Sequence, residues 1–579
     1  LCVKNGTIVN HDGMYEADIL VEEGIITKLE QGISPPEGAQ VIDAQGKLIF
    51  PGGVDCDCRF LNPSDEIPVA DEFKSASLAA LCGGTTTIVN EVPVCPGDSL
   101  LNTYETFLST ISKEICCDYA LCVSVPNFDA DVAAQMETLA TEKHVASFYL
   151  RLCTGNRTSN FLGLNEDSFL EALRTCSSLG VLPSVPACAN PVISSRLAEQ
   201  VAAEFPTLGP EGSLWASPER LEADTVNRVA LLASNADFVC PVLMARVHSQ
   251  AALDALVDQR RQGSSLLFGQ TSAAALAGIS ATTETPAGVR QTDWAKAASC
   301  ISDPPIRPDA ETAHRLLKHL ASGDLTAIGS AHRAVSGAVR AALGLRDFRR
   351  IPSGVATVGS RLAVLWKCAV EQQAVMDPCA FVACMSSNSA RLFNLYPRKG
   401  RIEKGSDADL VVWNSAVGKR DNEDRAGLLP DGVIDPFEGL ELSTCAPDVV
   451  VLRGRIVVQH GRPVDSSVEP GSGLLLAPEP FGTFTFGRAE TVKRSRESAL
   501  KAVPREAYTG PVLSLNGHEK TPPRESYYYR KEAYDNVPKA KLLPLSLPEA
   551  LPPGQRIIHT SVKTAHPPGG TANAFWWDR

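Results

Sequence analysis

The sequence predicts an α/β protein built around a (β/α)8 barrel, with a small β-sandwich and a flexible C-terminal tail. Three observations lead to this prediction. Eight short apolar runs alternate with amphipathic stretches between residues 54 and 330, which is the pattern of a parallel barrel. Strand-like runs without helices between them lie near both ends of this region. Beyond about Arg488 the chain is rich in Pro, Arg, Lys and Tyr and has no sustained periodicity, which is typical of a flexible tail.

The first 50 residues contain short strand-like runs separated by Asn-Gly and Glu-Gly turn signals. These runs are too short to form a domain alone. Similar runs far downstream are their natural partners. We therefore expect residues 1–50 and 396–480 to form one sandwich from Cys2–Lys4, Thr7–Asn10, Asp18–Val21, Ile25–Leu29, Leu410–Trp413 and Val449–Val458.

The barrel is expected over residues 51–395. Its eight strands are predicted at Val54–Cys58, Thr85–Glu91, Tyr119–Val125, Ser147–Leu152, Gly180–Pro186, Phe238–Arg246, Ser264–Phe268 and Leu325–Ser330. Helices are predicted at Asp71–Leu81, Leu100–Lys113 and Ser217–Ala233. Ser217 is the expected N-cap of the last of these, with Pro218 in its first turn.

The tail, residues 488–579, has the opposite charge to the rest of the chain. It holds fifteen Lys and Arg against nine Asp and Glu, a net charge of +6, whereas the whole chain carries -13. A basic arm on an acidic body suggests an interaction segment. A merely solvated tail is an equally good explanation.

Composition excludes several classes of function. The charge of -13 argues against nucleic acid as the main partner, because a phosphate binder needs a basic surface. No apolar run is long enough to cross a bilayer, and the first residues show neither the basic nor the apolar region of a signal peptide. Seventeen cysteines without repeated spacing suggest reduced thiols. We expect a cytoplasmic protein with no membrane span.

The clearest candidate site follows Pro51-Gly-Gly53, where Asp55, Asp57 and Arg59 alternate at the end of the first barrel strand. Active sites of such barrels lie at the carboxyl ends of the strands. Cys56, Cys58 and His332 are further candidate metal ligands, but alternation is expected to turn the two cysteines away from Asp57 toward the helices. Buried free cysteines, and core or rim positions for His248 and His332, are the favoured explanations. No Gly-x-Ser-x-Gly, Walker or His-Glu-x-x-His motif occurs.

Several longer stretches match a known family. They are Val41–Asp55, Gly83–Thr86, Cys116–Leu121, Gly209–Gly212, Ser217–Ala223, Asn394–Ile402 and Gly405–Trp413, with Gly554–Ile558 and Pro567–Gly570 in the tail. Through these residues the chain resembles a divergent collapsin response mediator protein, or dihydropyrimidinase-related protein, of the non-catalytic branch of the dihydropyrimidinases and cyclic amidohydrolases. The resemblance covers Cys2 to about Gly473 and resumes at the end of the chain.

The resemblance implies a cytosolic adaptor without a cofactor. Such an adaptor assembles as a homo- or hetero-tetramer with paralogues and binds tubulin and other cytoskeletal proteins in neuronal outgrowth, axon guidance and semaphorin signalling. The family's tails are phosphorylated at Ser or Thr before Pro. Thr521, which precedes Pro522, is therefore a candidate phosphosite, and Ser526 is a further one.

The resemblance also identifies the positions where the family's enzymes hold metal ions. The His-x-His pair of the first strand corresponds to Asp57 and Arg59, the carboxylated lysine to Tyr149, the two later histidines to Pro186 and Arg246, and the catalytic aspartate to Ala331. The oxyanion-binding tyrosine corresponds to Thr154. Every metal-site position is therefore substituted, and an arginine cannot ligate a cation.

These substitutions predict a pseudoenzyme with no catalytic residues and no metal. Hydrolysis of a neutral ring amide at pH 7 needs a strong nucleophile, which this class of enzyme obtains from a metal that lowers the pKa of bound water. Because a buried unpaired charge is costly, we expect Asp57 to pair with Arg59 or Arg246. Two alternatives remain: a hydrolase acting on the carbon-nitrogen bonds of cyclic amides with a rebuilt site, and a sensor that binds a small molecule at the barrel mouth.

Overall fold

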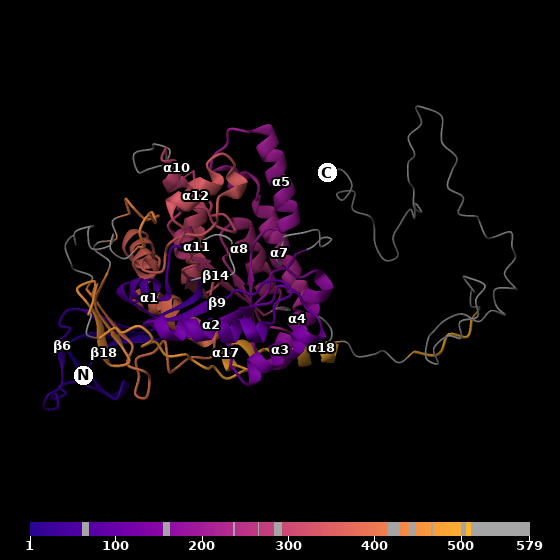
Figure 1. Cartoon of the computed structure of the whole chain (residues 1–579). Helices are drawn as coiled ribbons and strands as arrows, with labels where there is room; N and C mark the ends of the chain where they lie inside the picture. Colours follow the sequence, from indigo (N-terminus) through magenta and orange to yellow (C-terminus); the bar gives the residue numbers. More distant parts are fainter. Residues whose placement is uncertain are drawn as a thin grey trace, which may run out of the picture. The chain divides into compact units, whose positions relative to one another are not determined.

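The chain divides into two units, Leu1–Leu500 and Lys501–Arg579. The computed structural model describes residues 1–60, 69–153, 163–234, 238–263, 266–282, 292–414, 429–440, 442, 446–464, 467–499 and 505–510. All elements discussed below belong to the first unit (Figure 1). None of the helices in the described ranges is long and apolar enough to cross a membrane.

Eight parallel strands form the central sheet, in the order in which they occur along the chain. They are β8 (Gly53–Cys58), β9 (Thr85–Val92), β10 (Asp118–Ser124), β11 (Ser147–Tyr149), β12 (Leu182–Pro186), β13 (Val242–Ala245), β14 (Leu267–Ser272) and β15 (Ala327–Gly329). Each overlaps one of the eight predicted runs. The predicted barrel is therefore confirmed, with ends that differ by up to a few residues.

The last strand returns to the first and closes the barrel. The backbone N–H of Ala331, just after β15, donates to the carbonyl of Asp57 in β8 at 2.8 Å. The N–H of Arg59 donates to the carbonyl of His332 at 3.0 Å. Closure leaves no free sheet edge and brings the carboxyl ends of all eight strands to one rim.

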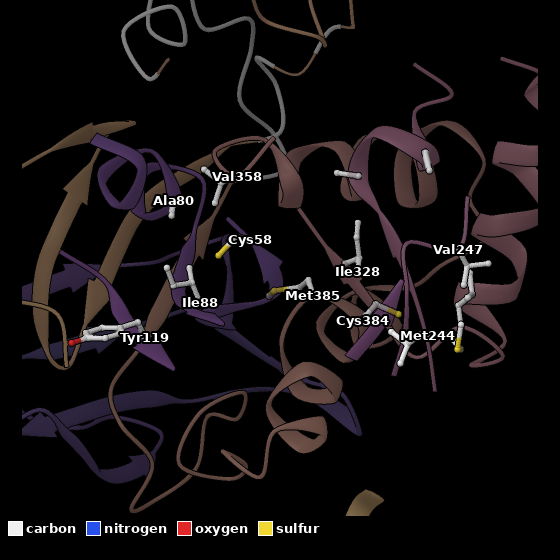
Figure 2. Close-up of a cluster of buried hydrophobic side chains, with 14 of the residues drawn as sticks. Cys58, Ala80, Ile88, Tyr119, Met244, Val247, Ile328, Val358, Cys384 and Met385 are labelled. Atoms are coloured by element: carbon white, nitrogen blue, oxygen red, sulfur yellow. The ribbon is translucent and has the colours of Figure 1, made fainter. Parts of the chain in front are cut away.

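Helices surround this sheet. They are α1 (Phe73–Cys82), α2 (Leu100–Glu114), α3 (Ala130–Thr141), α4 (Glu166–Leu179), α5 (Pro191–Glu204), α6 (Gly212–Trp215), α7 (Glu219–Leu232), α8 (Gln250–Gln262), α9 (Ala273–Leu276), α10 (Trp294–Ser299), α11 (Ala310–Ala321), α12 (Gly337–Gly344), α13 (Arg361–Leu365), α14 (Pro378–Val382) and α15 (Asn388–Leu392). Side chains such as Ile88 in β9, Met244 in β13 and Ile328 in β15 belong to one buried cluster with Ala80 of α1 (Figure 2). Apolar side chains on the outer face of the barrel strands thus pack against the helices and hold them on the barrel.

Two further sheets are built from the segments before and after the barrel. One contains β1 (Cys2–Lys4), β4 (Asp18–Glu22), β5 (Ile25–Glu30) and β6 (Val41–Asp43); the other contains β2 (Thr7–Asn10), β3 (Gly13–Glu16), β7 (Leu48–Pro51), β16 (Leu410–Trp413), β17 (Pro447–Leu452), β18 (Arg455–Gln459) and β19 (Arg462–Pro463). β7 and β16 pair antiparallel, so the two ends of the chain share one sheet. Val3, Ile19, Leu410 and Val451 lie in the buried cluster that these sheets share.

The sequence prediction is wrong at the start of two helical segments. Helix α7 begins at Glu219 with Pro218, not Ser217, as its N-cap, because the buried Ser217 carbonyl accepts a hydrogen bond from Arg307 at 2.9 Å instead of entering the helix. The range assigned to the flexible tail also begins with a helix, α18 (Ala489–Ala499), after the short α17 (Thr483–Phe486). An ion pair between Glu490 and Arg494 at 3.0 Å spans one turn of α18 and favours the helix.

Candidate functional site

The substituted positions lie along the carboxyl rim of the barrel. Asp57 lies in β8, Arg59 directly follows it, and Tyr149 and Pro186 end β11 and β12. Arg246 directly follows β13, and Ala331 lies two residues beyond β15. Thr154, Thr521 and Ser526 lie outside the described residues.

A bulge in β8 determines which of its side chains enter the barrel. Asp55 pairs with Ile88 of β9, whereas Cys58, three residues later, pairs with Asn90, only two residues later. Cys56 belongs to the inward cluster that contains Val89, and Asp57 reaches Arg246 across the barrel. The prediction that Cys56 points to the helices is therefore wrong, because the extra residue of the bulge interrupts the alternation. Cys58 does lie in the outer cluster, as predicted.

Asp57 and Arg246 form a bidentate ion pair across the barrel mouth. Arg246 Nε donates to Oδ2 of Asp57 at 2.7 Å, and Nη2 donates to Oδ1 at 2.7 Å. Only 11% of the Asp57 side chain and 13% of the Arg246 side chain are exposed. Burial alone would raise the pKa of Asp57, but the facing guanidinium of Arg246 holds this pKa below its ordinary value. The expectation that Asp57 pairs with one of the two arginines is confirmed.

The other arginine has a separate partner. Arg59 Nε donates to Oε2 of Glu91 at 2.7 Å, while Oε1 of Glu91 accepts from Ser124 at 2.5 Å. The Arg59 guanidinium also lies 5.5 Å from the centre of the Tyr149 ring. Burial lowers the pKa of Arg59, but Glu91 more than offsets this effect. Both arginines are thus neutralised within the protein.

Two rim residues hold a left-handed backbone. Arg246 has a φ of 58° and Ala331 a φ of 52°, a region that costs a residue with a side chain about 1 to 2 kcal/mol. Such strain persists where the surroundings impose it. At Arg246 the backbone N–H donates to Oε1 of Gln270 at 2.8 Å, and at Ala331 it donates to the Asp57 carbonyl.

The residues at these positions do not fit a metal ion. The donors that bind zinc are thiolates, neutral imidazoles and carboxylates. Arg59 and Arg246 are cations, Pro186 and Ala331 carry no donor atom, and burial raises the pKa of the Tyr149 phenol. Within the described ranges no group of three or more His, Cys, Asp and Glu side chains is arranged to hold a metal ion.

The alternative ligand set does not assemble either. Both nitrogens of the buried His332 are used: Nε2 lies 2.6 Å from Oδ2 of Asp71, and Nδ1 accepts from the N–H groups of Thr357 and Val358. Oδ1 of Asp55 accepts from the N–H of Ser330 at 2.8 Å. His332 is thus a core histidine, and its ring does not face Asp57.

Sequence reasoning missed Glu91, Gln270 and Asp303. Glu91 lies in a strand whose eight residues are all buried, and a charge inside such a run signals a buried partner. Asp303 accepts from Arg151 at 2.7 Å, and its carbonyl lies 3.4 Å from Nη1 of Arg246. Arg151 and Asp303 also line a cavity of about 720 Å³ between α5 and residues 347–351.

His248 lies beside the ion pair and is fully buried. Its Nδ1 lies 3.0 Å from the Pro304 carbonyl and its Nε2 lies 2.9 Å from the Ser272 hydroxyl. The pKa of His248 is lowered to about 4, mainly by burial and also by the charge of Arg246, while the hydrogen bond to the Pro304 carbonyl and the charge of Asp57 oppose the shift. The ring is therefore neutral at pH 7.

This depressed pKa predicts a loss of stability in acid. The unfolded state binds a proton on His248 near pH 6.5 and the folded state only near pH 4, so stability falls as the pH drops through this window. We expect the wild type to lose about 2 kcal/mol more free energy of unfolding between pH 7 and pH 4.5 than the His248→Asn variant. Urea titrations at both pH values measure this difference. Equal losses in the two proteins would contradict it.

Comparison with known proteins places this geometry in a family. Residues 306–457 match the model of the amidohydrolase family. The chain is 34% identical to a dihydropyrimidinase of Dictyostelium discoideum, over 88% of this chain and 96% of the relative. It is 33% identical to dihydropyrimidinase-related protein 5 of Mus musculus, over 88% of this chain and 86% of the relative. The D-hydantoinase (dihydropyrimidinase) from a Thermus species superimposes with a TM-score of 0.74 at 29% identity, over 83% of this chain and 99% of that structure.

Proposed function

Because this chain belongs to the family of dihydropyrimidinases and dihydropyrimidinase-related proteins within the amidohydrolases, we propose that it is a non-catalytic member that acts as an adaptor. Enzymes and dihydropyrimidinase-related proteins match the chain to a similar degree, so the relatives alone do not separate the two possibilities. The proposal therefore rests on the chemistry of the residues at the barrel mouth.

The observation that carries the proposal is the ion pair between Asp57 and Arg246. Asp57 is the one carboxylate among the substituted positions, and both of its oxygens accept from the guanidinium. A hydrolase of this class needs donors that hold a metal, because the metal supplies the hydroxide that attacks the amide. A guanidinium at the same place occupies the remaining carboxylate and repels a dication.

The adaptor role is the part of the proposal that comes from the family. As an adaptor, the chain would bind tubulin or other cytoskeletal proteins in the cytoplasm and would assemble with copies of itself or with paralogues. The basic segment 488–579 is the proposed contact for acidic partner surfaces, and its affinity would fall with rising salt. Phosphorylation of Thr521 or Ser526 would reduce the positive charge of this segment.

The metal content of the purified, untagged protein tests the loss of catalysis. We expect far less than one zinc ion per chain, both as purified and after incubation with excess zinc followed by desalting, because the described residues of the rim offer no ligand set. Atomic emission spectrometry measures this ratio. Zinc bound tightly at a fixed ratio would contradict the proposal, and Cys56, Asp57 and His332 together with cyclic-amide hydrolysis would then need testing.

Co-sedimentation with microtubules tests the adaptor role. The full chain should pellet with microtubules at low salt, and a variant whose tail lysines and arginines are changed to glutamine should pellet much less. Equal recovery of the two proteins would remove the tail from the interaction. No recovery of the unmodified chain would exclude tubulin as its partner.

A second candidate is a small-molecule sensor, and the cavity of about 720 Å³ beside Arg151 and Asp303 favours it. This volume lies within the range of ligand sites in proteins. Thermal stabilisation by dihydropyrimidines or nucleobases would support this function, and a flat screen would argue against it.

A further inference from the structure

Helix α5 is poorly covered by the rest of the protein. Of its 14 residues only the first, Pro191, is buried. Its inner side contacts a small cluster through Ala198, Val201 and Ala202. In Figure 1 the helix stands at the outside of the unit, at the same end as α10 and α12. A helix of this length is marginal in water by itself, so its open face is a candidate contact surface.

The open face carries two charges without partners. Arg196, Gln200 and Glu204 are exposed and follow one another at intervals of four residues, which places them along one stripe of the helix. Neither Arg196 nor Glu204 forms an ion pair or a side-chain hydrogen bond with any residue that the structure describes. Arg196 lies four residues before Gln200 and Glu204 four residues after it, about 6 Å away on either side.

Exposed apolar side chains lie near both ends of α5. Ile193 is 41% exposed near the start of α5. Phe205, 40% exposed, directly follows α5, and Trp215, 54% exposed, ends α6. The rings of Phe205 and Trp215 form an edge-to-face pair with centres 5.3 Å apart. Large aromatic side chains of this kind are enriched among the residues that contribute most to protein interfaces.

We propose that a second copy of this chain docks on this surface, with the two α5 helices antiparallel about a two-fold axis at Gln200. In a two-fold contact, residue i of one copy meets residue j of the other and the reverse. Arg196 of each copy then faces Glu204 of the partner subunit. Ile193 of each copy lies toward the Phe205 and Trp215 pair of the partner subunit. The spacing makes the stripe complementary in charge to its own inverted copy.

This inference rests on the self-assembly that is part of the proposed function, and it identifies the residues that would mediate the contact between copies. It is independent of the metal content and of tubulin binding, which test the other parts of that function. A heterologous contact of α5 with a different surface would lack the pairing of Arg196 with Glu204, so charge reversal distinguishes the two arrangements.

Sedimentation velocity of the full chain over a range of concentrations tests the proposal. Arg196→Glu places like charges opposite each other twice per dimer, and so does Glu204→Arg. We expect each change to raise the dissociation constant about tenfold or more. The double variant R196E/E204R restores opposite charges and should return the constant to within about threefold of the wild type. Arg261→Glu, an exposed charge reversal at the end of α8, is the matched control and should change nothing.

The outcomes separate the surface from self-assembly itself. Single variants that associate like the wild type, or a double variant as weak as the singles, would overturn the surface while leaving self-assembly in place. A wild type that is monomeric at every concentration would overturn both. A third outcome is that Trp215→Ala abolishes binding of purified tubulin and leaves self-association unchanged. This result would assign the surface to another partner and overturn the proposal.

A cross-link provides a second readout at the axis. Gln200→Cys places two thiols near each other only if the helices pair about this residue. We expect a short bis-maleimide to join position 200 of one copy to position 200 of the other, identified by mass spectrometry, and Arg261→Cys to give no such product. The absence of the link in a sample that sediments as a dimer would overturn the proposal.

Discussion

Lys399→Met is expected to lower the free energy of unfolding by about 3 to 5 kcal/mol, because it removes an ammonium group that contacts three buried carboxylates. Lys399 is 1% exposed, and its Nζ lies 2.6 Å from Asp118, 2.7 Å from Asp409 and 2.9 Å from Asp407. Burial alone would lower the pKa of Lys399, but these carboxylates raise it above its ordinary value. The methionine keeps the volume of the side chain and removes its charge.

The position of this cluster explains why the effect should be global. Asp118 begins β10 of the barrel, whereas Asp409 precedes β16 of the second sheet. Lys399 therefore connects the barrel with the β-sandwich, and uncompensated carboxylates at this junction weaken both. Arg453, which lies 3.2 Å from Asp118, offsets only part of the charge.

Urea unfolding followed by circular dichroism measures this effect. Lys404→Met is the matched control, because Lys404 lies in the same segment and is exposed, and its loss should change the free energy of unfolding by less than about 0.5 kcal/mol. If Lys399→Met cost less than about 1 kcal/mol, the Lys399 cluster would not be an important connection between the barrel and the β-sandwich.

Arg246→Met is expected to be nearly as harmful, at about 3 to 5 kcal/mol, because it leaves the Asp57 carboxylate buried without its partner. Asp57→Asn should have a similar cost, since it leaves the guanidinium unpaired. The double variant should lose clearly less than the sum of the two, because neither charge then remains. This non-additivity distinguishes a coupled ion pair from two independent side chains.

An exposed ion pair provides the control for this cycle. Arg228 and Glu166 are 39% and 45% exposed, and Arg228→Met should cost no more than about 1 kcal/mol. Strictly additive effects of Asp57→Asn and Arg246→Met would contradict the coupling. They would also remove the main support for the proposed loss of the metal site.

Much of the fold could be predicted because it depends on local patterns. The eight strand runs and the runs near both chain ends were recognisable from apolar and β-branched residues and from turn signals. The predicted end of the fourth barrel strand at Leu152 is wrong, because β11 stops at Tyr149. The bulge in β8 could not be predicted, because it reflects how β8 pairs with β9 and with the end of β15.

The sequence by itself determined which residues stand at the family's metal-site positions: two arginines, a tyrosine, a proline, an alanine and one aspartate. Only the tertiary structure decided which arginine pairs with that aspartate. Asp57 lies 189 residues from Arg246 and two from Arg59, yet it pairs with the distant one, while Arg59 turns to Glu91. The physical reason is that partner choice depends on the stagger of strands and on barrel closure, which set the direction of each side chain. Residue type alone does not contain that direction.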